Sequence, residues 1–135
     1  MLTPLYQTLV GGIDLKRDFE YVTSYFDLIQ YSTEEEASRE IPDGLFSFFN
    51  QEFAYNLLMS CDKNAILFVN GDADTFLPVY LQQKKSIRKD VAVINSGMLA
   101  LPPYCNYLEK KYNLKFNLHD AKSNPNELAY AFLTQ

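Results

Sequence analysis

The chain has 135 residues, of which 47% are apolar and 21% charged, values that are ordinary for a globular protein. A chain of this length buries roughly two-thirds of the surface that it exposes when unfolded, so we expect one domain built around one core. The formal net charge of -5 argues against nucleic acid as a partner, because binding phosphates requires clustered Lys and Arg.

No stretch of the sequence approaches the ~20 apolar residues that cross a bilayer, and no secretory leader is recognisable at the N-terminus. We therefore expect a soluble chain without a transmembrane segment, either cytoplasmic or a soluble domain of a cell-envelope protein. Cys61 and Cys105 form neither a zinc knuckle nor a redox pair, so both are expected to be reduced and partly buried. The basic pairs at 84–85, 88–89 and 110–111 are interpreted as solvated charges near helix ends.

Helical patterns dominate the first 62 residues. A stripe of apolar residues predicts a helix from Asp14 to about Tyr31. Thr33 and Glu36 have the spacing of a capping box, so a second, short helix with solvated charges is expected to run until Pro42.

A third helix is predicted from about Leu45 to Cys61, and its apolar content suggests that it is the most buried of all. One side of this helix is expected to carry an apolar set that includes Phe49 and Phe53, both buried. The members of this set are Phe46, Phe49, Phe53, Leu57 and Leu58.

Strands and helices alternate from residue 63 onward. Continuous apolar runs at 65–69 and 91–94 predict two strands that are covered on both faces, and helical spacing between them predicts a helix. After a loop at 95–101, Pro102-Pro103 begins another helix, and the alternation from Leu114 to Leu118 predicts a half-exposed third strand. A last helix is expected at 124–133.

The predicted fold class is α/β: a small parallel three-stranded sheet with helices on both faces, preceded by an N-terminal helical segment. Strands that alternate with helices pair in parallel through right-handed crossovers, and a parallel sheet needs cover on both faces. We expect a single domain over 1–135, with a helical part at 1–62 and an alternating part at 63–135.

Polar side chains follow each of the three predicted strands. They are Asn70, Asp72, Asp74 and Thr75 after the first strand, Asn95 and Ser96 after the second, and His119 and Asp120 after the third. Because the carboxyl ends of parallel strands meet at one edge, where open α/β folds bind ligands, these residues are the predicted ligand site.

The two aspartates of the acidic turn, Asp72 and Asp74, have three interpretations. One of them caps the helix that follows, with Gly71 in a tight turn and nothing bound. Alternatively, both hold a divalent cation together with Asp120 or water. Thirdly, an apolar strand that ends in Asp-x-Asp resembles the metal and sugar-nucleotide motif of one class of glycosyltransferases. No phosphate-binding glycine loop accompanies it.

His119 is the single histidine, so a nucleophilic triad would have to use it. Ser96 or Cys105 could serve as the nucleophile with His119 and Asp120, although neither lies in a nucleophile turn. The simpler interpretation is a solvated or hydrogen-bonded histidine in a loop.

The segment from Asn64 to Leu108 resembles a known family. The similarity is carried by Asn64-Ala65-Ile66-Leu67-Phe68-Val69-Asn70-Gly71-Asp72-Ala73-Asp74-Thr75-Phe76, Tyr80-Leu81-Gln82, Arg88-Lys89-Asp90-Val91, Val93-Ile94-Asn95 and Tyr107-Leu108. It is similar to the soluble segment that follows the membrane helices of bacterial protein O-mannosyltransferase-like proteins, a family of unknown function. Ala73 stands where the family pattern has Asn, and Leu77-Pro78-Val79 where it has Pro-Leu-Trp. The resemblance implies a related soluble domain, linked to the cell envelope or free-standing, without transferase activity.

The sequence thus favours a non-catalytic ligand-binding or protein-interaction domain, whose partner is a small polar ligand or a protein. The alternative is a metal-assisted, glycan-directed enzyme or an accessory domain of a glycosyltransferase, with Asp72 and Asp74 as metal ligands. No cofactor is predicted, apart from the divalent cation of that alternative.

Overall fold

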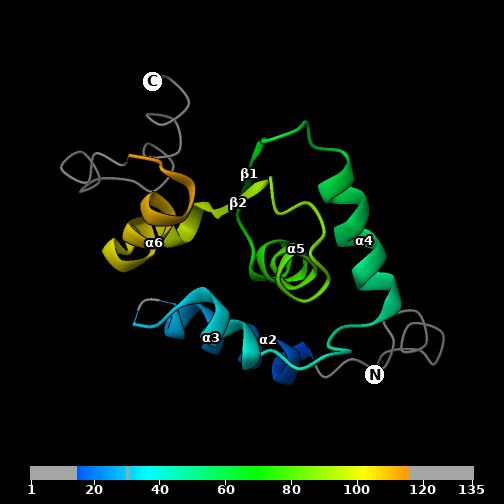
Figure 1. Ribbon diagram of the computed structural model, residues 1–135. Coiled ribbons are helices and arrows are strands. Elements are labelled where there is room, and N and C mark those ends of the chain that lie inside the picture. Colours follow the sequence, from blue (N-terminus) through cyan, green and yellow to red (C-terminus); the bar gives the residue numbers. More distant parts are fainter. Residues whose placement is uncertain (1–14, 30, 116–135) are drawn as a thin grey trace.

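The computed structural model describes residues 15–29 and 31–115 (Figure 1). Within these residues, five α-helices and one 3-10 helix accompany a small two-stranded parallel sheet. The elements in chain order are α2 (Leu15–Leu28), α3 (Glu34–Arg39), α4 (Phe48–Met59), β1 (Ile66–Val69), α5 (Asp72–Lys85), β2 (Ala92–Asn95), the 3-10 helix η1 (Ser96–Ala100) and α6 (Pro102–Tyr112).

The two N-terminal helices form as predicted. α2 buries Val22 and Phe26, and Ile29, which directly follows the helix, is buried as well. The capping box of α3 is present: the Thr33 hydroxyl accepts from the Glu36 backbone N–H, and the Glu36 carboxylate accepts from the Thr33 N–H. This box satisfies two backbone donors at the helix start and thereby fixes where α3 begins.

The predicted parallel pairing of the two apolar strands is confirmed. β1 and β2 are paired in register from Ile66 opposite Ala92 to Val69 opposite Asn95. α5 connects them, and Figure 1 shows it below the sheet, between α4 and α6. The predicted third strand lies outside the described residues except for Leu114 and Lys115, which belong to no strand, and the predicted last helix lies outside them entirely.

α5 is the centre of the core. Every residue from Thr75 to Gln82 is buried, including Pro78 inside the helix. On one side its Phe76 ring lies 5.6 Å from the Phe26 ring of α2, and on the other side its Tyr80 ring packs edge-on against Phe46 at 5.3 Å. The chain therefore folds around the helix that joins the two strands.

The predicted burial of the third helix is wrong. α4 begins at Phe48 rather than Leu45 and buries only Ala54 and Leu58, while Phe49 and Phe53 are 64% and 48% exposed. The reason is that apolar residues lie all around this helix, while α4 packs on α5 along one side only. The small residue Ala54 allows the close approach, and the aromatic rings lie on the opposite side.

Two further expectations need correction. β1 is not covered on both faces, since Ile66 is 37% exposed and only Val69 is buried, whereas all four residues of β2 are buried. The segment after β2, expected to be a loop, forms η1. The Asn95 side chain accepts from the backbone N–H groups of Gly97 and Met98, and these two bonds begin the 3-10 turn.

Among the described residues, no helix is long and apolar enough to cross a membrane.

Candidate functional site

The structure brings together the polar residues that follow β1 and β2, as the parallel pairing requires. The Ser96 hydroxyl lies within donating distance of the Asn70 side-chain oxygen, at 3.1 Å, and of the Val69 carbonyl, at 3.2 Å. The Asn95 amide donates to the Thr75 hydroxyl at 3.0 Å, and that hydroxyl donates to the Gly71 carbonyl at 2.8 Å.

These hydrogen bonds engage the polar atoms of the strand ends with one another. Thr75 is fully buried and Asn95 is 3% exposed, and the Asn95 backbone N–H donates to the Tyr104 hydroxyl at 3.1 Å. The two residues therefore join α5, β2 and α6 in the interior. Of the predicted ligand residues in these two loops, Asn70, Asp72 and Asp74 present exposed side chains.

The expected helix cap at Asp72 or Asp74 is wrong. Gly71 is the N-cap of α5, no side chain caps it, and both aspartates lie exposed in the first helical turn. There the carboxylates face the positive end of the helix dipole without capping it. The described residues contain no group of three or more His, Cys, Asp or Glu side chains that could hold a metal ion, and His119 and Asp120 lie outside them.

The two candidate nucleophiles are held inside the fold. Cys105 is fully buried and its thiol donates to the Leu99 carbonyl at 3.3 Å, while burial raises the pKa of that thiol. Ser96 is 9% exposed and bonded as described above. Both cysteines are free, as the sequence predicted. Ser96 and Cys105 are therefore both buried, while His119 and Asp120, the other members of the triad alternative, lie outside the described residues.

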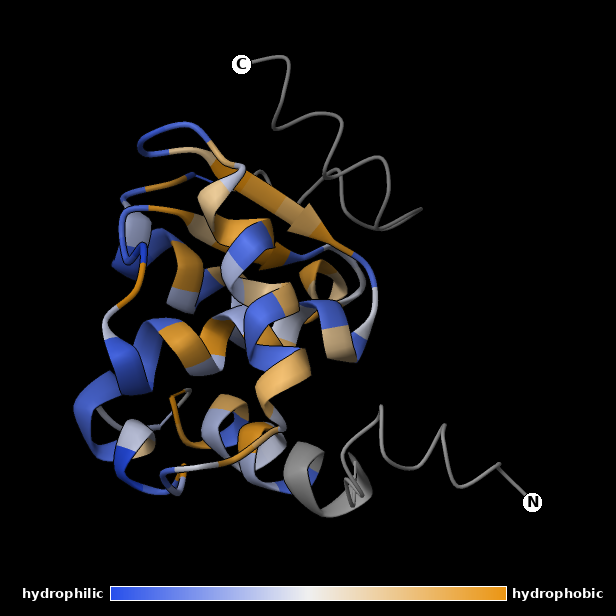
Figure 2. Ribbon diagram, turned by 90° about the vertical axis from the view of Figure 1, so that its right-hand side faces the viewer, coloured by the Kyte–Doolittle hydropathy of each residue, from blue (hydrophilic) through white to orange (hydrophobic). Residues whose placement is uncertain are grey.

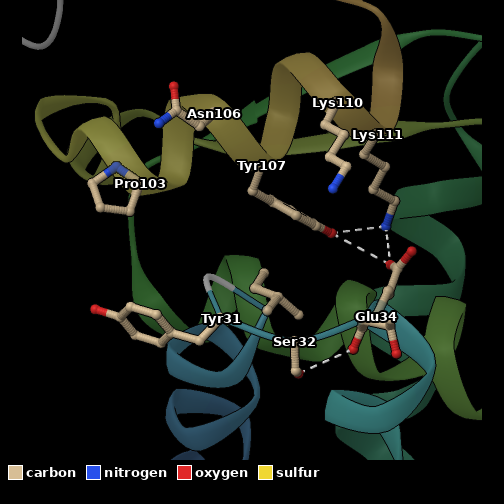
Figure 3. A pocket seen from close by; sticks show the side chains of 10 residues that line it. Tyr31, Ser32, Glu34, Pro103, Asn106, Tyr107, Lys110 and Lys111 are labelled. Atoms are coloured by element: carbon tan, nitrogen blue, oxygen red, sulfur yellow. Dashed lines mark hydrogen bonds and ion pairs between the residues drawn. The ribbon is translucent and has the colours of Figure 1, made fainter.

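A second candidate site, which the sequence did not predict, lies between the α2–α3 connection and α6 (Figure 3). It is an open groove of about 850 Å³, a volume that suits a small-molecule site. Its lining residues are Ile29, Tyr31, Ser32, Thr33, Glu34, Pro103, Asn106, Tyr107, Lys110 and Lys111.

Glu34, the first residue of α3, is the acceptor at the inner wall of this groove. Its Oε1 atom accepts from Gln83 at 2.6 Å, from the Tyr25 hydroxyl at 3.1 Å and from the Tyr107 hydroxyl at 3.4 Å, and it also forms a salt bridge with Lys111. One carboxylate thus connects α2, α3, α5 and α6.

Burial and the Glu34–Lys111 interaction shift the pKa values of these two residues in opposite directions. Burial alone would raise the pKa of Glu34, but the hydrogen bond and charge of Lys111, followed by the other donors, hold that pKa below its usual value. Burial also lowers the pKa of Lys111, and Glu34 opposes this change. For Tyr25 and Tyr107 burial and the Glu34 charge raise the pKa, so both phenols remain protonated donors.

Sequence reasoning missed this groove because its residues are far apart in the chain. Glu34 precedes Lys111 by 77 positions. The local signal was the i, i+4 pair of Tyr107 and Lys111, whose ammonium donates to the Tyr107 hydroxyl at 2.9 Å. Lys111 was interpreted together with Lys110 as a solvated charge near a helix end, whereas only 19% of the Lys111 side chain is exposed.

Comparison with known families gives a match over residues 50–125, more than half of the chain, to TMEM260-associated domain 2. The chain belongs to this family. No curated protein and no solved structure matches the chain. The matched residues include β1, α5, β2, α6 and all of α4 except its first two residues, and they exclude α2 and α3. The strand-end residues thus lie inside TMEM260-associated domain 2, while Glu34 lies before it.

Within TMEM260-associated domain 2, several motif residues that carried the sequence resemblance are structural. The Tyr80 hydroxyl accepts from the Gly44 N–H at 3.1 Å, and the Gln82 amide donates to the carbonyls of Arg88 and Val91 at 2.9 and 2.7 Å. These bonds fasten α5 to the turns around it. The motif residues therefore indicate a shared scaffold.

Proposed function

We propose that this chain is a non-catalytic protein-interaction domain and that the apolar face of α4 is its contact surface. The apolar face of α4 consists of Phe48, Phe49, Phe53, Tyr55 and Met59. The observation that carries the proposal is their exposure, which is 79%, 64%, 48%, 40% and 49% in that order.

Such a cluster is unusual on a surface in contact with water. Single exposed apolar residues are ordinary, but a contiguous group on one helix indicates a contact site, and Phe, Tyr and Met are enriched at the centres of protein interfaces. Burial of apolar surface contributes about 25 cal/mol per Å², which supplies the driving force for association. Figure 2 views the protein from the side on which α4 lies.

The helix geometry places the apolar residues along two edges of this face. Phe49 and Phe53 are four residues apart and lie along one edge, while Phe48 and Met59 lie on the other edge. Glu52 and Asn56, both exposed, lie between the two edges and offer polar contacts. An amphipathic helix or a hydrophobic groove of a partner would complement this arrangement.

The family indicates the partner class. TMEM260-associated domain 2 is linked by its name to a TMEM260 membrane protein, and the sequence resembles a segment that follows membrane helices in O-mannosyltransferase-like proteins. We therefore propose that the apolar face of α4 packs against a protein of this membrane-protein class. The internal hydrogen bonding of Thr75, Asn95 and Ser96 supports a scaffold role for the strand ends.

Co-purification tests this proposal. The chain is co-expressed with the TMEM260-type membrane protein of the same genome, and the detergent-solubilised complex is isolated through a tag on the membrane protein. Phe49→Glu combined with Phe53→Glu should abolish recovery of the chain, because charge is then placed in the contact. The control is Leu101→Glu, which adds one charge at a residue that is 49% exposed outside α4. Equal recovery of the double variant and the wild type would contradict the proposal.

A further inference from the structure

The groove between the α2–α3 connection and α6 has hydrogen-bond donors that its own residues do not use. The Lys111 ammonium is bonded to Glu34 and to the Tyr107 hydroxyl, and it also lies 5.2 Å from the centre of the Tyr112 ring, so its contacts are largely internal. Lys110 is exposed and forms no ion pair with another described residue. Figure 3 shows its ammonium directed toward the Tyr107 hydroxyl.

The charge of the groove is positive in an acidic protein. Lys110 and Lys111 contribute two positive charges against the one negative charge of Glu34, and no other lining residue is charged. The chain as a whole carries -5. An anion with several acceptor atoms would meet the three donors of the Lys110 ammonium and the positive charge of Lys111.

The opposite end of the groove is formed by two rings. The Tyr31 side chain is 88% exposed and lies across the groove from the Pro103 ring (Figure 3). The Tyr31 N–H donates to the Leu28 carbonyl at 2.9 Å. The uncovered aromatic face of Tyr31 offers a stacking surface for a flat or apolar ring.

We infer that this groove binds a small organic anion in which a phosphate or carboxylate group is attached to a single ring. The anionic group would lie at Lys110 and Lys111, and the ring between Tyr31 and Pro103. The groove volume of about 850 Å³ accommodates such a molecule with room for water. Glu34 positions Lys111 and does not contact the ring.

Isothermal titration calorimetry of the full chain tests this inference with three probes: phenyl phosphate, inorganic phosphate and phenol. Phenyl phosphate should bind more tightly than either fragment, because it alone occupies both ends of the groove. Equal affinity for phenyl phosphate and inorganic phosphate would overturn the inference, and so would an absence of phenyl phosphate binding.

Two exposed-residue variants locate the site without threatening the fold. Lys110→Gln should weaken phenyl phosphate binding about tenfold, as expected for a lost charged hydrogen bond. Tyr31→Ala should weaken phenyl phosphate binding about threefold or more and leave inorganic phosphate unchanged. The matched controls are Lys63→Gln and Tyr21→Ala, which alter an exposed lysine and an exposed tyrosine outside the groove. Equal losses in a variant and its control would overturn the inference.

Discussion

Arg88 and Asp90 form a two-point ion pair that fastens the end of α4 to the turn before β2. The Arg88 Nε and Nη2 atoms lie 2.9 and 3.0 Å from the two Asp90 carboxylate oxygens. The same guanidinium donates to the carbonyls of Leu58, Cys61 and Asp62, and Asp90 accepts from the Asn64 backbone N–H at 2.9 Å. Arg88 therefore supplies donors to carbonyls in the last turn of α4 and in the segment just after it.

The Arg88–Asp90 pair makes stability depend on pH. Hydrogen bonds from Arg88, followed by the Asn64 N–H, hold the pKa of Asp90 well below its usual value. Because the folded-state pKa is depressed, the stabilisation is fully present above the unfolded pKa of about 3.9 and is lost as pH falls toward the folded value. Asp90→Asn should therefore be less stable than wild type at neutral pH, and the difference should shrink in acid.

Urea denaturation of wild type and Asp90→Asn between about pH 7 and about pH 2.5 measures this difference. Glu52→Gln is the control, since Glu52 is exposed and forms no ion pair with another described residue. A constant difference between Asp90→Asn and wild type across the acidic range would contradict the assigned role of the carboxylate.

The two faces of α4 should respond differently to truncation. Leu58 is fully buried, so Leu58→Ala should cost about 2–5 kcal/mol through lost transfer energy and the cavity left behind. Phe49 is 64% exposed, so Phe49→Ala should change stability by only about 0.5 kcal/mol in either direction. Urea unfolding measures the free energy of unfolding of both variants relative to the wild type. A loss of several kcal/mol in Phe49→Ala would show that the apolar face of α4 is covered within the chain itself.

α4 shows why the sequence predicted the presence of a helix but not which of its residues are buried. Ser47, whose hydroxyl accepts from the Asn50 N–H, begins a helix that local spacing had indicated three residues earlier. Leu45 and Phe46 leave the helix because Phe46 adopts a φ of +66° and packs on Tyr80. Which side of an apolar helix faces the core depends on its partner, α5, and periodicity within α4 carries no such information.

Glu34 should be far more important for stability than its neighbour Glu35. Glu34→Ala removes the acceptor for four donors and leaves Lys111 partly buried without its partner, so it should cost about 1–3 kcal/mol. Glu35→Ala should cost at most about 1 kcal/mol, because the Glu35–Arg39 pair is exposed to solvent. Thermal and urea unfolding of Glu34→Ala and Glu35→Ala measure the two losses of stability. Equal losses would mean that the Glu34 network adds nothing beyond a surface ion pair.

The candidate sites differ in how much of them the sequence could reveal. The strand-end residues follow apolar runs directly, so their convergence at one edge was predictable from parallel pairing. Their hydrogen bonding was not, because whether Asn95 faces Thr75 or solvent depends on the packing of α5 against β2. The groove at Glu34 depends on contacts between residues more than 70 positions apart, which only the folded chain brings together.

The exposed pair Asp72 and Asp74 remains the place to test the metal hypothesis. Since neither caps α5, both act through the helix dipole, and replacement of either by Asn or Ala should lose a similar amount, about 0.3–1 kcal/mol, in the absence of metal. If the two carboxylates hold a cation, calcium, magnesium or manganese should raise the melting temperature of the wild type, and Asp72→Asn or Asp74→Asn should remove that rise. Thermal melts of the four variants with and without each cation separate the two roles. An Asn variant as stable as wild type beside a destabilised Ala variant would restore the capping interpretation, because Asn caps a helix about as well as Asp.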